Sequence, residues 1–259
     1  MAWPNEPAGS TVISDWGFNT CNGGGWFGDC AGIVNDAGAP ISPPQTMRFR
    51  YDPATGFGGG ELWTIINARE FYLSFFHKLS DPFEGAGNGS NKVIFSFTDD
   101  SIAWYLKWQG EQGSGQFFPS FFWTTAEPQN DTYLDNCHIT ENFYVADPDF
   151  PCLLRQWNAP TPVPLGVWFQ FEMHYKASST VSNRDGFVRY WLDGSLILNL
   201  NNLNTPDANV SQLFFTPTWT PPIDRSNPDE MWWDHVRVSL PTGSPDTTPP
   251  NPPTGITVT

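Results

Sequence analysis

One stretch of the chain, from Gly166 to Leu200, constrains the fold more than any other. Between Trp168 and Lys176 apolar and polar side chains alternate, which is the period-two pattern of a half-buried β-strand. A second apolar run ends at Asp193-Gly194, and a third follows at once. An Asp-Gly pair between such runs predicts a type I′ hairpin, because both central residues of that turn need positive φ. The stretch is therefore expected to be an antiparallel meander with one apolar and one polar face.

Short apolar runs broken by turn residues continue through most of the chain. We expect strands at residues 47–51, 69–79, 92–97, 102–108, 117–123, 213–216 and 231–240. No convincing amphipathic helix pattern lies between them, so the sequence predicts a sandwich or barrel rather than alternating strands and helices. Residues 1–46 are expected to be an ordered loop region, and residues 127–164 a long irregular insertion.

Several motifs together resemble the concanavalin A-like jelly-roll sandwiches. They are the Gly-x-Trp before the alternating strand, Asp185-Gly-x-x-Arg-x-Trp-x-Asp-Gly, the run 232–238, and the upstream pieces 47–51, 69–76 and 91–95. More narrowly, they resemble the branch of secreted bacterial polysaccharide-lyase-like and laminin-G-like proteins. The resemblance covers roughly residues 10 to 240. It implies an all-β fold, a two-sheet antiparallel β-sandwich, that recognises polysaccharide outside the cell.

The chain of 259 residues fits one jelly-roll domain over residues 1–240. Residues 241–259 are rich in proline, as in a semi-rigid spacer. They resemble the linker and opening strand of a fibronectin type III or other immunoglobulin-like module. We therefore expect a neighbouring Ig-like domain in a longer, modular protein.

The formal net charge of −15 restricts the partners. A field of that sign repels nucleic acid and anionic membranes, so we expect neither as a partner. No apolar run approaches the length of a membrane span. The same charge disfavours a long polyanionic glycan, unless the binding cleft is locally basic or holds a cation.

The four cysteines, Cys21, Cys30, Cys137 and Cys152, have no zinc-site spacing. Three pairings are possible, and proximity in sequence favours Cys21 with Cys30 and Cys137 with Cys152. Structural disulfides predict an exported protein, and free buried thiols are the alternative. The first residues lack a secretory signal, so we expect the signal to have been removed and the location to be secreted or cell-surface.

The polar set of side chains in the alternating strand between Trp168 and Lys176 supplies the candidate glycan contacts. An aromatic ring stacks on the C–H face of a sugar, and neighbouring polar groups bind its hydroxyls. The alternative is that this parity faces solvent or a covering loop, and the sequence does not say which sheet it occupies. The candidate substrate-binding residues are Trp168, Gln170, Glu172, Lys176, Trp191 and, at another strand end, Lys92.

A lyase that cleaves a uronic-acid chain needs a base, an acid and a group that neutralises the carboxylate. His174 is the candidate base, Tyr105 or Tyr190 the acid, and Arg189 or Gln170 the neutralising group. The Arg-x-Glu-x-Arg and Gln-Ile-His signatures of alginate lyases are missing. The paired-carboxylate strand of laminarinase-like hydrolases is missing too, which disfavours a glycosidase.

A structural calcium ion is a further expectation. In many carbohydrate-binding jelly rolls an acidic residue of the last strand joins oxygen ligands from the N-terminal segment. Here Asp234 and Asp36 are the candidate ligands, with Asp15 and Asp29 as others. The alternative is that Asp234 caps a turn through backbone N–H groups.

Two functions remain open from the sequence. The first is a secreted polysaccharide lyase that cleaves an acidic glycan by β-elimination. The second is a non-catalytic carbohydrate-binding or adhesion module of a multidomain extracellular protein. Recognition of a polysaccharide is common to both.

Overall fold

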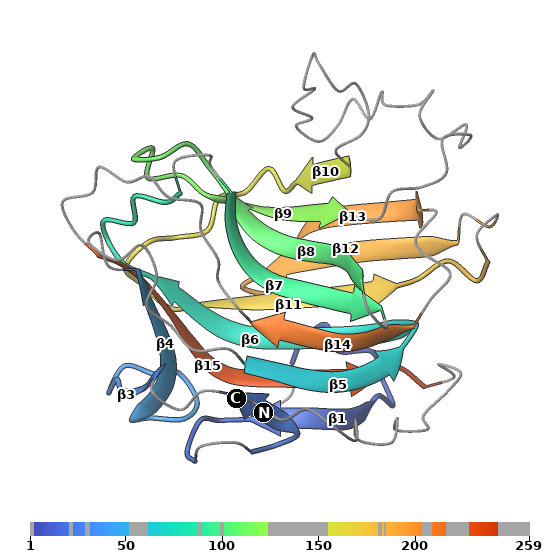
Figure 1. Cartoon of the computed structure of the whole chain (residues 1–259), viewed down its shortest axis with the longest axis horizontal. Coiled ribbons are helices and arrows are strands. Elements are labelled where there is room, and N and C mark those ends of the chain that lie inside the picture. Colours follow the sequence, from blue (N-terminus) through green and yellow to red (C-terminus); the bar gives the residue numbers. More distant parts are fainter. Residues whose placement is uncertain are drawn as a thin grey trace.

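A computed structural model describes the chain at residues 3–20, 23–28, 32–51, 62–86, 90–98, 101–123, 155–180, 183, 185–203, 209–215 and 228–242. These residues form two antiparallel sheets that pack face to face (Figure 1). The predicted two-sheet β-sandwich is thereby confirmed. The four cysteines and Asp29 lie outside the described residues, as does the tail from residue 243. Within the described ranges no helix is long and apolar enough to span a membrane.

Sheet A has eight strands, in the order β13-β12-β11-β6-β15-β4-β3, with β1 also paired to β15. Their bounds are β1 (Thr11–Trp16), β3 (Ile33–Asn35), β4 (Gln45–Tyr51), β6 (Glu70–Leu79), β11 (Phe169–Lys176), β12 (Gly186–Leu192), β13 (Ser195–Leu203) and β15 (Asp229–Leu240).

Sheet B has seven strands, in the order β10-β9-β8-β7-β14-β5-β2. Their bounds are β2 (Trp26–Gly28), β5 (Leu62–Ala68), β7 (Ser90–Thr98), β8 (Ser101–Gln109), β9 (Phe118–Trp123), β10 (Arg155–Asn158) and β14 (Val210–Phe215). In Figure 1 the strands β5, β14, β7, β8 and β9 lie in front of sheet A, and β7 and β8 curve strongly.

The core between the sheets is dominated by aromatic rings. Trp104 of sheet B stacks on Phe71 of sheet A, with ring centroids 6.1 Å apart. Trp108 meets Phe171 edge to face at 5.3 Å. All four side chains are fully buried, and such pairs add about 0.5–1.5 kcal/mol each beyond their buried area. Because side chains alternate along a strand, this packing determines which residues the two outer faces present.

The predicted hairpin is present between β12 and β13. Asp193 has φ 48° and Gly194 has φ 76°, so both central residues have the positive φ of a type I′ turn. The other predicted strands are found as well. The loop predicted for residues 1–46 is wrong in part, since β1, β2, β3 and the start of β4 lie there. Strands β5 and β10 were also not predicted. Strand β1 carries Ser14 and Asp15 in its centre, which hides its period-two pattern.

An N-terminal segment, residues 3–7, lies across the outer face of sheet A, and we call it the N-terminal strap. Asn5 donates two hydrogen bonds to the carboxylate of Glu172, from its backbone N (3.0 Å) and from Nδ2 (2.9 Å). The hydroxyl of Tyr72 donates to the same carboxylate. Glu172 and Tyr72 are fully buried, and Trp3 of the strap packs 5.2 Å from Phe76. The strap therefore closes the middle of this face.

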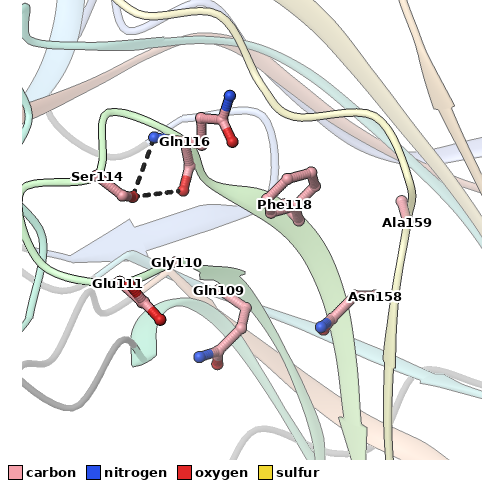
Figure 2. A pocket seen from close by; sticks show the side chains of 8 residues that line it. All are labelled: Gln109, Gly110, Glu111, Ser114, Gln116, Phe118, Asn158 and Ala159. Carbon is pink, nitrogen blue, oxygen red and sulfur yellow. Dashed lines mark hydrogen bonds between the residues drawn. The ribbon is translucent and has the colours of Figure 1, made fainter. Parts of the chain in front are cut away.

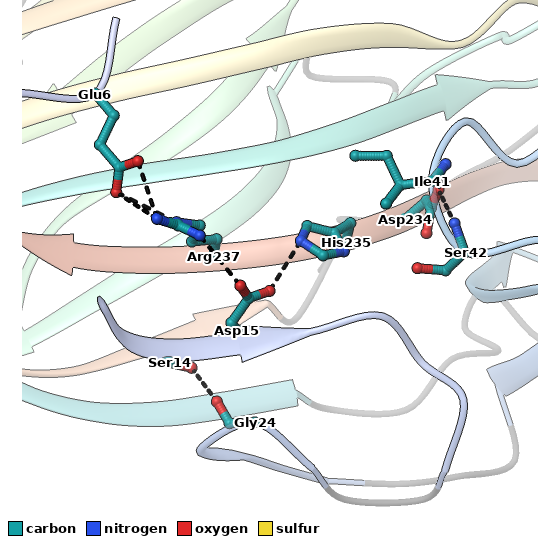
Figure 3. A network of polar contacts seen from close by, with 9 residues as sticks. All are labelled: Glu6, Ser14, Asp15, Gly24, Ile41, Ser42, Asp234, His235 and Arg237. Carbon is teal, nitrogen blue, oxygen red and sulfur yellow. Dashed lines mark hydrogen bonds and ion pairs between the residues drawn. The ribbon is translucent and has the colours of Figure 1, made fainter. Parts of the chain in front are cut away.

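Arg237 of β15 fastens the strap and strand β1 (Figure 3). Its Nη2 lies 3.0 Å from both carboxylate oxygens of Glu6, and its Nη1 lies 3.3 Å from Asp15. Nε2 of His235 lies 2.9 Å from the same Asp15. Burial raises the pKa of Asp15, but the hydrogen bonds and positive charges of His235 and Arg237 outweigh it and hold this pKa below its usual value.

Removing the buried carboxylate should destabilise the fold. Glu172→Ala leaves the Tyr72 hydroxyl and the Asn5 donors without their acceptor, so we expect the free energy of unfolding to fall by about 3 kcal/mol. Asn5→Ala removes one of these hydrogen bonds and should cost about 1 kcal/mol. Urea unfolding measures both. Lys176→Ala, on the same face but partly exposed, is the control, and an equal effect of Glu172→Ala and Lys176→Ala would contradict the strap's role.

Candidate functional site

The outer face of sheet B presents a row of aromatic rings that crosses five strands. Cross-strand register aligns Trp63, Phe214, Phe95, Tyr105 and Phe122, from β5, β14, β7, β8 and β9 in turn. Trp63 stacks on Phe214 at 6.1 Å, and Tyr105 stacks on Phe122 at 4.5 Å. We call this set the aromatic row. Trp63, Phe214 and Tyr105 are partly exposed, whereas Phe95 and Phe122 are buried. The exposed parts of the row offer flat apolar surfaces on which the C–H faces of sugars can stack.

Two lysines lie beside the aromatic row. Lys92 and Lys107 are register partners on β7 and β8. The ammonium group of Lys92 lies 5.4 Å from the ring of Tyr105, and that of Lys107 lies 4.8 Å from the ring of Phe122. Both distances are within the range of cation–π attraction. This part of an acidic protein therefore gathers two lysine amines over one aromatic surface.

The surroundings of these groups alter their protonation. Burial lowers the pKa of Lys107 to about 7, and the nearby charge of Lys92 lowers it further in the same direction. Lys107 is only 4% exposed, which is the reason for the large effect of burial. Burial also raises the pKa of Tyr105 to about 12. Near neutral pH, Lys107 can therefore accept a proton, while Tyr105 keeps one that it can donate.

A pocket of about 350 Å³ continues this face past Lys107 (Figure 2). Gln109 lies two residues after Lys107 on β8, and its register partner is Phe118 of β9. Pockets that bind small ligands begin at about 300 Å³. The lining residues are Gln109, Gly110, Glu111, Ser114, Gln116, Phe118, Asn158 and Ala159.

The structure brings together two of the predicted site residues, Lys92 and Tyr105, on this face. Lys107 was not among the predicted site residues, although it lies two residues from Tyr105 in the same predicted strand. The available signal was the period-two pattern of β8, in which Tyr105, Lys107 and Gln109 share one parity. What the sequence could not show is that Lys107 is buried.

The other predicted residues of the central strand lie on sheet A, on the opposite side of the molecule. Glu172 is buried under the N-terminal strap, so it has no surface for a glycan. Nε2 of His174 lies 2.9 Å from Oε1 of Glu70. Arg189 lies over the ring of Phe187 at 4.3 Å. Lys176 and Trp191 are half-buried on the same outer face.

Tyr190 does not share a face with His174 and Arg189. It is fully buried in the core, 5.1 Å from the ring of Phe171, and burial raises its pKa well above the usual value. A hydroxyl enclosed between the two sheets cannot reach a glycan. The predicted triad of His174, Tyr190 and Arg189 is therefore not assembled.

Trp168 directly precedes β11, and Gln170 lies at the start of this strand on the outer face of sheet A. The ammonium group of Lys78 lies between two rings, 4.9 Å from Trp168 and 4.6 Å from Trp232. Gln170 is anchored through its backbone N, which donates to Oδ1 of Asp193 at 2.8 Å. Trp168 thus already packs against a protein cation.

The candidate calcium ligands fit a cation only in part. Asp36 pairs with Lys78 and accepts a hydrogen bond from the backbone N of Gly38. Oδ2 of Asp234 accepts from the backbone N of Ile41 (2.8 Å) and of Ser42 (3.2 Å) (Figure 3), which is the turn-capping alternative. Its Oδ1 is buried without a hydrogen-bond partner among the described residues. The described part of the chain gathers no three His, Cys, Asp or Glu side chains around a metal position, so calcium stays a prediction.

Solved structures similar to this one include polysaccharide lyases. An endo-β-1,4-glucuronan lyase from the fungus Trichoderma reesei matches with a TM-score of 0.50 and 15% identity, over 82% of this chain and 86% of that chain. The alginate lyase Aly36B matches with 0.53 and 17%, over 90% and 97%. The alginate lyase vAL-1 from a Chlorella virus matches with 0.52 and 14%, over 88% and 99%.

At these identities the likeness establishes the fold, which is the expected concanavalin A-like jelly roll. No protein-family model matches the sequence. No curated protein sequence matches it either.

Burial of the Lys107 amine should lower the free energy of unfolding of the protein. Its pKa is about 7 when folded and close to 10.5 when exposed, so the folded state binds fewer protons than the unfolded state between these values. Stability then rises with pH through this window. We expect Lys107→Met, which removes the buried amine, to stabilise the protein by about 2 kcal/mol more at about pH 6 than at about pH 9.

Urea unfolding of both proteins at the two pH values measures this difference. Lys176→Met is the matched control, because the Lys176 side chain is partly exposed and lies on the other sheet, sheet A. An equal effect of Lys107→Met at the two pH values would show that the amine is not desolvated.

Proposed function

We propose that the protein is a polysaccharide lyase that cleaves an acidic glycan by β-elimination on the outer face of sheet B. The observation that carries the proposal is the cluster of Lys107, Tyr105 and Lys92 beside the aromatic row. It combines the three groups that the reaction needs, namely a proton acceptor, a proton donor and a cation for the carboxylate.

Each group has one task in the proposed reaction. Lys92 binds the carboxylate of the uronate and stabilises the charge that develops when the neighbouring C5–H bond breaks. Neutral Lys107 takes the C5 proton. Electrons move into a new C4–C5 double bond as the C4–oxygen bond breaks, and Tyr105 gives its proton to the leaving oxygen. The proton on Lys107 later returns to the tyrosinate through solvent, which restores the starting state.

The surroundings support these tasks. Burial keeps Lys107 neutral at a pH where an exposed lysine is charged, and it keeps Tyr105 protonated. The pocket next to Lys107 leaves room for a sugar unit. Similar structures include enzymes named as glucuronan and alginate lyases, which supports the reaction class through the shared fold.

The second candidate function is glycan binding without cleavage, as in an adhesion module. The aromatic row favours it, because its partly exposed rings, those of Trp63, Phe214 and Tyr105, give a stacking surface that needs no catalytic base. Both functions fit a protein that acts on polysaccharide outside the cell, and secretion belongs to the same proposal.

Loss of the base should abolish cleavage. When the protein is incubated with glucuronan, alginate, pectate or hyaluronan, we expect ultraviolet absorbance to rise because cleavage creates an unsaturated sugar end. Lys107→Ala should lower kcat by at least about 100-fold, since general base catalysis contributes that much or more. The matched control is His174→Ala on sheet A, which should leave the rate unchanged.

Three other results would decide against this proposal. If His174→Ala abolished the rise and Lys107→Ala did not, the site would lie on sheet A. If no glycan gave a rise but the protein was retained on insoluble glycan, binding without cleavage would be the function. If neither occurred, both candidates would fail.

The pH dependence should report the protonation of Lys107. Only the neutral amine can take a proton, so kcat/KM should rise with pH through about 7 and decline as Tyr105 ionises near 12. Lys92→Gln removes a positive charge that lowers the pKa of Lys107, so the rising limb should move to higher pH. Lys92→Arg keeps the charge and should leave the limb in place. An unchanged limb in Lys92→Gln would contradict the coupling of the two lysines.

A further inference from the structure

Positive charge is scarce along the proposed binding face. The whole chain has 12 Lys and Arg residues against 27 Asp and Glu. Among the described side chains on the outer face of sheet B, Lys92 and Lys107 are the cations, and they are direct register partners. If Lys107 is the neutral base, Lys92 is the cation that remains among these described side chains to pair with a carboxylate. The face is therefore equipped for one uronate at a time.

The pocket beside Lys107 suits an uncharged sugar. Its polar lining includes the amides of Gln109 and Gln116 and the carboxylate of Glu111 (Figure 2), and none of the described residues that line it is a cation. Amide groups bind sugar hydroxyls, and the ring of Phe118 offers a stacking surface. Glu111 is exposed, and its charge repels the carboxylate of a uronate. A unit placed here is better bound if it carries no charge.

The pocket is close enough to hold the unit next to the one cleaved. Gln109 follows Lys107 by two residues, and a strand rises about 3.3 Å per residue, so the two side chains are about 7 Å apart along the face. A sugar bound at the pocket therefore directly neighbours a sugar bound at Lys107.

Across the neighbouring strands β14 and β5, the described side chains of this face are also uncharged. Beyond Lys92 the aromatic row continues through Phe95 and Phe214 to Trp63. Neighbouring strands lie about 4.8 Å apart, so this part of the row extends roughly 10 Å from β7 to β5. Gln212, on the same parity of β14, adds an amide. Stacking and hydroxyl binding, rather than charge pairing, are what this surface offers.

We infer that the substrate carries its carboxylates singly, as a glycan in which a uronate alternates with uncharged sugars rather than an unbroken chain of uronates. The inference rests on the proposed function and narrows its substrate class. Three observations support this substrate class. They are the single cation at the cleavage position, the acidic and amide-lined pocket, and the aromatic row. The net charge of −15 acts in the same direction, because it repels a densely charged chain.

Initial rates on two kinds of polymer test the inference. Glucuronan and alginate carry a carboxylate on every unit, whereas hyaluronan and deacylated gellan separate their glucuronates by uncharged sugars. At equal uronate concentration, we expect kcat/KM to be at least about tenfold higher on one of the alternating polymers than on either homopolymer. Equal or faster cleavage of a homopolymer would overturn the inference and leave the proposed lyase standing. No cleavage of any of the four, or of pectate, would overturn the proposed function, and the inference with it.

A charge-reversal variant tests the role of the pocket. Glu111→Lys should raise kcat/KM on glucuronan relative to hyaluronan by about threefold, the size of an exposed charge interaction, and the gain should shrink in high salt. Asp185→Lys makes the same charge change at an exposed position before β12 of sheet A and should leave the ratio unchanged. Equal ratios in the two variants would remove Glu111 and the pocket from the explanation.

Discussion

The buried carboxylate of Glu172 holds the N-terminal strap over the outer face of sheet A. It lies in the middle of sheet A and accepts hydrogen bonds from Tyr72 and from both nitrogens that Asn5 offers. A carboxylate without solvent is tolerated only with such partners, so the strap that carries Asn5 is held in place. Sheet A is thereby covered at its centre. The outer face of sheet B carries the aromatic row and the two lysines, of which Trp63, Phe214, Tyr105 and Lys92 are partly exposed.

A buried lysine lowers the stability of the folded protein, so its presence in a protein points to a function other than packing. An amine with a pKa near 7 at neutral pH gives up either its charge or its hydration on folding. Lys107 lies at the surface side of its sheet, beside a tyrosine, a second lysine and a pocket. Perturbed groups that gather at a cleft are a common property of active sites. We therefore take this arrangement as support for the proposed proton transfer.

The sequence predicted the architecture better than the site, for a physical reason. Alternation and turn residues are local, so the strands of the meander and the Asp193-Gly194 hairpin were predicted correctly, while β1 was missed because Ser14 and Asp15 interrupt its pattern. Which outer face is covered depends on contacts between Asn5 and Glu172, more than a hundred and sixty residues apart. The sequence therefore predicted His174 as the base and left Tyr105 and Tyr190 open as the acid, whereas the proposed site uses Lys107 and Tyr105.

The central claim is that an acidic glycan binds across β7, β8 and β9 of sheet B. A crystal structure of Lys107→Ala with a bound uronate oligosaccharide tests it most directly. The account predicts a uronate carboxylate at hydrogen-bonding distance from Lys92, with a sugar ring stacked over the aromatic row. A glycan found on the outer face of sheet A, beside His174 and Arg189, would contradict it.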